Sequence, residues 1–155
     1  MPIGVFADKL FDLTNREGGA IAEQWHKSVS TNPRTPAFRS LPKDELVRQA
    51  AALYKNLKQM YFSEKAFDEV AQYLERSRYV EDLLARRVPL AEIIYSLILM
   101  RRYIWLHADT QTIFFDTSYD VQQQTDSINR TVLVFDYIIY LAIQRYEKLT
   151  SPGKK

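Results

Sequence analysis

Apolar residues recur at steps of three and four along most of the chain, which is the spacing of one face of an α-helix. Alternation of apolar and polar residues, the signature of a strand, is almost absent. The pattern predicts helices over residues 5–15, 20–29, 42–61, 63–87, 89–108 and 119–149. The segment Asp109–Thr117 mixes apolar residues with threonines and favours neither state. The sequence therefore predicts an all-α fold.

Turn-forming residues separate these predicted helices. Gly18 and Gly19 interrupt or kink the first one, and three prolines predict a loop over residues 32–42. Phe38 and Leu41 are expected to hold that loop against the core. Ser63 is a candidate N-cap for one helix that continues to about Arg87. The order of helices and loops indicates a single multi-helix domain over residues 1–150, followed by a flexible tail or linker over 151–155.

The predicted helix from Pro89 to Ala108 is apolar almost all round between Ile93 and Met100. A helix of this kind is normally buried among other helices. We therefore expect it to be the centre of the domain, wrapped on all sides by its neighbours.

The final predicted helix carries a heptad-like series of apolar residues. A second apolar side is formed by Leu133, Tyr137, Tyr140 and Leu141. Two interpretations follow: one side packs in the core while the other contacts a second molecule, or both form one broad buried face. Under the first interpretation, the heptad-like series predicts a homodimer interface formed by Ile128, Val132, Phe135, Ile139 and Ala142.

Composition narrows the classes of function. The chain has 155 residues, 46% of them hydrophobic, a net charge of +2 and no cysteine. Disulfides and thiolate chemistry are thereby excluded, and interleaved acids and bases argue against nucleic-acid binding. No secretion signal is apparent, and the longest apolar run is shorter than the ~20 residues that a membrane span requires. We expect a cytoplasmic protein that does not bind a membrane.

Candidate chemistry is sparse. Glu23 and His26 have the spacing of half a di-iron site, but no second such pair follows, so no metal site is predicted. His107 lies at the carboxyl end of the central helix, where the helix dipole favours a cation. Tyr103, Trp105 and His107 could line a pocket for a small apolar ligand, and His107 could alternatively be an axial haem ligand. No catalytic set can be assembled, so we expect no enzyme and no obligatory cofactor.

Four segments, taken in order and spacing, resemble the N-terminal input domain of the RsbT co-antagonist (RsbRD-type) proteins, with similar domains preceding bacterial histidine kinases. The likeness covers about residues 5–148 and rests on Ile21–Trp25, Phe38–Leu46, Leu83–Ile94 and Leu97–Trp105. The chain departs from this pattern at Arg87, where relatives often carry glycine.

The resemblance implies a globin-like helical fold without haem, a dimer, and a signal passed through the C-terminal helix to an output domain. The chain ends at Lys155 with no output module, so we expect either an excised input domain or a stand-alone relative. The sequence thus predicts a bacterial sensor domain for signal transduction in stress responses. The alternative is a globin-like protein that binds haem or another hydrophobic ligand.

Overall fold

The computed structural model describes residues 4–110 and 121–151, and every regular element in those residues is helical. This confirms the predicted all-α fold with a long C-terminal helix. The predicted helix start near Tyr119, the segment 111–117 and the tail from Pro152 lie outside the described residues. The elements are α1 (Gly4–Arg16), α2 (Gly18–Val29), the short 3-10 helix η1 (Pro36–Ser40), α3 (Lys43–Phe62), α4 (Ala66–Ser77), α5 (Tyr79–Ala85), α6 (Leu90–Thr110) and α7 (Val121–Thr150).

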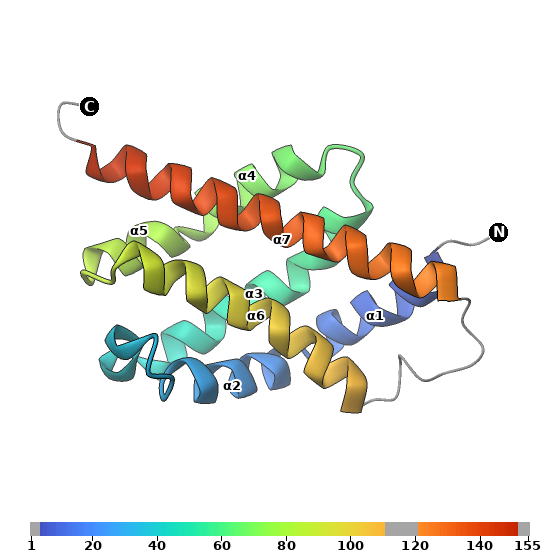
Figure 1. Ribbon diagram of the computed structural model, residues 1–155, viewed down its shortest axis with the longest axis horizontal. Helices are drawn as coiled ribbons and strands as arrows, with labels where there is room; N and C mark the ends of the chain where they lie inside the picture. Colours follow the sequence, from blue (N-terminus) through green and yellow to red (C-terminus); the bar gives the residue numbers. More distant parts are fainter. Residues whose placement is uncertain (1–3, 111–120, 152–155) are drawn as a thin grey trace.

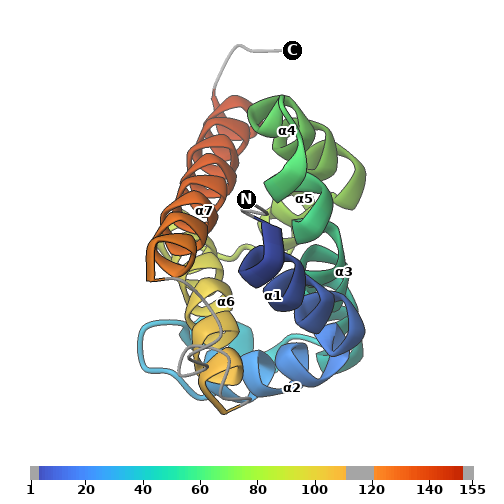
Figure 2. The same ribbon diagram turned by 90° about the vertical axis from the view of Figure 1, so that its right-hand side faces the viewer.

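The helices enclose one core. α6 and α7 run antiparallel, side by side, along one side of the molecule (Figure 1). Seen from the end, α3 lies on the opposite side and α1 fills the space between α3 and α7 (Figure 2). The largest fully buried side chains come from four α-helices and from η1 in the loop: Phe6, Phe11, Trp25, Phe38, Tyr54 and Phe135.

The break between α1 and α2 is a single residue, Glu17, one position before the predicted interruption. α2 begins at Gly18, which packs closely on α3. A Cβ atom at Gly18 would lie 3.4 Å from the carbonyl oxygen of Ala51 and 3.4 Å from the Cβ of Tyr54. Both are ordinary van der Waals distances, so the small residue allows α2 and α3 to lie close together, and a side chain larger than alanine would crowd α3.

The proline-rich loop is held at both ends by polar contacts. The Thr35 hydroxyl is buried and donates to the carbonyl of Val29 at 2.7 Å. The backbone N–H of Ala37 donates to the Glu92 carboxylate, in the first turn of α6, at 2.8 Å. Phe38 is fully buried, as predicted, and Leu41 packs against the core. The loop is therefore an ordered connection from α2 to α3.

The prediction of one helix over residues 63–87 is wrong. The chain instead forms α4 and α5, which meet at Arg78, a residue in the left-handed conformation with φ 56°. Ser63 does not cap α4, which begins at Ala66, and its hydroxyl accepts the N–H of Lys65 at 3.0 Å instead. No glycine or proline marks the break, so the sequence pattern did not reveal it.

Arg87, where the sequence differs from the input domains that it resembles, also has a left-handed backbone, with φ 63°. The N–H of Val88 donates to the carbonyl of Leu83 at 3.0 Å, and that of Arg87 to Leu84 at 2.9 Å. This pair of bonds is the Schellman ending of α5, in which glycine usually occupies the left-handed position. A residue with a Cβ atom costs about 1–2 kcal/mol in that conformation. The turn therefore forms with arginine, but under strain.

The expectation that the central helix is wrapped on all sides is only partly right. Ile93, Leu97, Met100 and Ile104 of α6 are fully buried. Arg102 is exposed, however, and Leu106 keeps 40% of its surface exposed. The reason is that α7 covers only one flank of α6, which leaves an outward stripe along the helix.

The core face of α7 differs from the predicted series. It includes polar residues, Gln123, Ser127 and Thr131, together with Val134, Phe135, Ile138 and Ala142. Ser127 accepts a hydrogen bond from the Tyr61 hydroxyl at 3.2 Å, which satisfies it inside the bundle. Arg130 donates to the carbonyls of Tyr61 and Ser63, at 2.7 and 3.1 Å, and so caps the end of α3.

Candidate functional site

The ligand pocket expected around Tyr103, Trp105 and His107 stays a prediction, and the structure shows where the three side chains lie. Tyr103 and His107 are one turn apart on α6 and share a side, but Trp105 projects from a different side because adjacent helical positions diverge. Tyr103 and Trp105 are half-buried and pack against the core, and His107 is buried. Tyr103 and His107 thus share one side of α6, and Trp105 lies on another.

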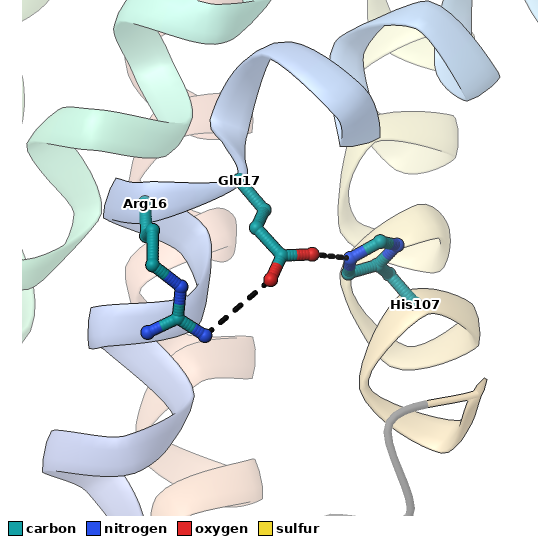
Figure 3. Close-up of polar contacts among 3 residues, drawn as sticks. All are labelled: Arg16, Glu17 and His107. Carbon is teal, nitrogen blue, oxygen red and sulfur yellow. Dashed lines mark hydrogen bonds and ion pairs between the residues drawn. The ribbon is translucent and has the colours of Figure 1, made fainter.

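His107 instead forms an ion pair or hydrogen bond with Glu17 at the break between α1 and α2 (Figure 3). Its Nε2 lies 2.7 Å from the Glu17 Oε1, and its side chain is only 7% exposed. Because a carboxylate can only accept, Nε2 must carry the proton. Arg16 adds a weaker contact to the other carboxylate oxygen at 3.4 Å. Residues 90 positions apart thus join the end of α6 to the joint between α1 and α2.

The charge of Glu17 is stabilised in this arrangement. The hydrogen bond from His107 is the main cause that lowers the pKa of the Glu17 carboxyl from its ordinary value of 4.5, although burial opposes it. A carboxyl whose pKa is lowered in the folded state stabilises that state above the unfolded pKa. This contribution is lost as the pH falls through the folded pKa.

We therefore expect Glu17→Gln to reduce the stability of the protein near pH 7 but to have little effect near pH 3. Glutamine removes the charge that neutral pH favours, whereas acid removes the same charge from the wild type. Urea unfolding midpoints of both proteins between pH 7 and pH 3 measure the difference. Asp12→Asn, which breaks an exposed ion pair with Lys58, is the control. A constant gap between wild type and Glu17→Gln across this range would contradict the assignment.

Three other helices donate hydrogen bonds to α6. The Trp25 indole of α2 donates to the carbonyl of Ser96 at 2.9 Å, and the Tyr54 hydroxyl of α3 donates to the carbonyl of Met100 at 2.9 Å. The Tyr79 hydroxyl of α5 is 2.8 Å from the Ser96 hydroxyl. Burial raises the pKa of Tyr79 and of Tyr54, so both remain protonated donors. These contacts fix the position of α6 in the bundle.

The residues predicted to form a dimer interface separate into two groups. Phe135 and Ala142 are fully buried in the core of the protomer and offer no surface to another molecule. Ile128, Val132 and Ile139 are half-buried on the side of α7 towards α6. Their contact with a second copy stays a prediction.

Half-exposed isoleucines of α6 extend the same surface. We define the α6/α7 face as Ile94 and Ile98 of α6 with Ile128, Val132, Ile139 and Ile143 of α7, all half-buried. Arg101 of α6 and Asp136 of α7 lie 3.8 Å apart across the line where the two helices meet. The face is therefore apolar, with one exposed ion pair in its middle.

The pair Glu23 and His26 does not form a metal site. Glu23 forms an ion pair with Lys43 at 3.0 Å, and burial with the nearby Lys43 lowers the pKa of His26. Across residues 4–110 and 121–151, no three histidines or carboxylates come together in a way that could hold a metal ion. In the same part of the chain, no helix is long and apolar enough to cross a membrane.

A groove of about 180 Å³ lies between α4 and α7, and Arg145 and Lys148 form its polar side. Its apolar side consists of Ala71, Leu74 and Leu141.

A protein-family model that fits this chain was not found, and neither a curated protein nor a solved structure matches it.

Proposed function

We propose that this chain is a cytoplasmic input domain of bacterial signal transduction that acts as a homodimer and has no enzymatic activity. Two copies associate through the α6/α7 face, and a change in helix packing reaches an output domain or partner protein through α7. The globin-like relationship and the role in stress responses belong to the same proposal. The observation that carries it is the α6/α7 face, a set of half-buried apolar residues along the longest helix of the domain and its neighbour α6.

The composition of the α6/α7 face supports association. Six β-branched apolar residues, each partly accessible in the protomer, surround the Arg101–Asp136 ion pair on this face. Contiguous exposed apolar surface on a folded domain commonly marks a protein contact. α6 also accepts the hydrogen bonds from α2, α3 and α5 described above, and α7 contributes its other side to the core. A partner bound to the α6/α7 face would therefore contact helices that are linked to the rest of the bundle.

The mechanism requires two arrangements of the helices that a signal distinguishes. A small apolar ligand or a partner can shift the population only if it binds one arrangement better than the other. α7 is 30 residues long, spans the bundle and ends with exposed residues after Tyr146. A shift of α7 at the core would therefore be carried to the position where an output domain would follow.

Analytical sedimentation tests the dimer directly. We expect the wild type to sediment as a dimer and Val132→Glu combined with Ile143→Glu to sediment as a folded monomer. Leu133→Glu combined with Tyr140→Glu is the matched control, because these residues are exposed on the other side of α7. Far-UV circular dichroism verifies that each variant is folded.

A monomeric wild type at about 100 μM, a typical concentration for weak dimers, would refute the dimer proposal. A dimer that persists in the Val132 and Ile143 variant would place the interface elsewhere. The haem alternative gains no support from the geometry, because the Nε2 atom of His107 is already engaged by Glu17.

A further inference from the structure

The short helix α5 contacts three other helices through three polar side chains. Tyr79 bonds to Ser96 of α6, and Asp82 accepts a hydrogen bond from Gln49 of α3 at 2.9 Å. Glu81, which lies between them, pairs with Arg145 of α7. One element of seven residues thus connects the central helix, the opposite wall of the bundle and the C-terminal helix.

Both ends of α5 are strained. Arg78 precedes it and Arg87 follows its last turn, and both have the left-handed backbone that glycine adopts at least cost. Both side chains are exposed, so neither is held in that conformation by burial. The packing of α5 itself, through its buried residues Tyr79, Val80 and Leu83, must therefore hold the strained ends in place.

The contact between Glu81 and Arg145 is unusually well covered. The Nε of Arg145 donates a hydrogen bond to one carboxylate oxygen of Glu81, and a terminal nitrogen of Arg145 forms an ion pair with the same oxygen. The Glu81 side chain is only 10% exposed, whereas that of Arg145 is 28% exposed. The second carboxylate oxygen is buried and has no hydrogen-bond partner among the described residues. Arg145 is thus the cation that compensates a buried negative charge.

The Glu81–Arg145 pair lies near the carboxyl end of α7, beyond the last residue of that helix that is fully buried. Ala142 is the last fully buried residue of α7, and the side chains from Glu147 to Thr150 are exposed. Within α7, Arg145 and Tyr146 are the only residues beyond Ile143 that remain partly covered. The Glu81–Arg145 pair is consequently the last charged contact between the bundle and the end of α7.

We infer that the Glu81–Arg145 pair is a conformational latch. When it is closed, α5 holds the last two turns of α7 against the bundle; when it is open, those turns separate while the core stays folded. Through Tyr79 and Asp82, the latch responds to the packing of α6 and α3. Its role in regulating signal output rests on the proposed function, but the latch itself is a property of the isolated chain.

Amide hydrogen exchange followed by mass spectrometry tests the latch on the full chain. We expect Arg145→Met to accelerate exchange at residues 146–150 on the order of tenfold or more, because it leaves the Glu81 charge buried without a partner. Glu81→Gln is expected to have a smaller effect, since the remaining guanidinium can turn towards water. The double variant is expected to exchange more slowly than Arg145→Met alone, because no buried charge remains.

Two controls separate the latch from a general loss of stability. Glu45→Gln breaks the exposed Glu45–Arg86 pair at 2.8 Å and is expected to leave exchange in α7 unchanged. Exchange in α1 and α2 should stay at the wild-type rate in every variant. Arg145→Lys keeps the charge but loses the fork of donors, so it provides a milder variant if Arg145→Met does not fold.

Unchanged exchange at residues 146–150 in both Arg145→Met and Arg145→Lys would overturn the latch. Acceleration to the same extent in α1 and α2 would do so too, because it would mean that the pair stabilises the whole fold. All samples are compared at a concentration where sedimentation gives the same oligomeric state. If sedimentation shows no dimer, the exchange result still tests the latch. If exchange shows no latch, sedimentation still tests the dimer.

Discussion

Phe135→Asp is expected to unfold the protomer. Phe135 is fully buried, so the substitution removes a large aromatic group from the core, which by itself costs about 3–5 kcal/mol. It also places a carboxylate in the interior with no cation beside it, at a further cost of several kcal/mol. The sum approaches or exceeds the net stability of about 5–15 kcal/mol typical of a domain.

Far-UV circular dichroism and urea unfolding measure this effect. We expect Phe135→Asp to lose its cooperative transition, whereas Leu133→Asp, at a position that is 43% exposed, should change stability by only about 0.5 kcal/mol. A cooperative transition near the wild-type midpoint in Phe135→Asp would show that this part of α7 does not face the core. Loss of a dimer in any Phe135 variant would carry no information about contacts between copies.

Trp25→Ala is expected to produce the second largest effect, a loss of about 3–5 kcal/mol in the free energy of unfolding. Trp25 is fully buried, and its indole N–H is the donor that joins α2 to the Ser96 carbonyl. Alanine removes the ring and the hydrogen bond together. Urea denaturation followed by circular dichroism gives the change in free energy.

Trp25→Phe separates the two contributions, because it retains most of the buried aromatic surface and loses only the donor. We expect it to cost about 1–2 kcal/mol, with part of this from the smaller ring. A loss below about 1 kcal/mol for Trp25→Ala would contradict a core position, since truncation of a buried aromatic costs more. In a Trp105→Phe background, the remaining Trp25 should emit at the short wavelength of a buried indole.

The elements were largely predictable from the chain, because apolar periodicity and prolines act locally. α3 and α6 begin directly after Pro42 and Pro89, two residues that mark helix starts in the sequence. The break at Arg78 was not predictable in this way. It arises because α5 must turn to pack Tyr79 and Val80 into the core, and that demand comes from residues distant in sequence.

The core face of α7 illustrates why polar residues mislead a prediction. The heptad-like series and the second apolar side contain only apolar residues, so the sequence pattern places Ser127 and Thr131 on neither of them. In the fold they point inwards, because Tyr61 supplies a hydrogen bond to Ser127 and the Thr131 hydroxyl donates to the carbonyl of that same residue. Phe135 consequently belongs to the interior and not to the α6 side.

The contacts of the candidate site were the least predictable part. Glu17 and His107 carry no shared motif, and their pairing depends on where two helix ends meet. Glu81 and Arg145 are 64 positions apart and appear in the sequence as ordinary surface charges. Only the burial of one partner, which follows from tertiary packing, distinguishes them from solvated residues.

The hydrogen bonds from Trp25, Tyr54 and Tyr79 restrict how α6 can move. They reach residues on two successive turns and come from three directions in the bundle. A rotation of α6 about its long axis by the angle between successive residues would carry Ser96 and Met100 away from all three donors together. A displacement along the axis or a small tilt can be followed by the flexing donor side chains. Under the proposed function, a signal should therefore move α6 by a small shift along its axis or a small tilt, because a rotation would break all three hydrogen bonds together.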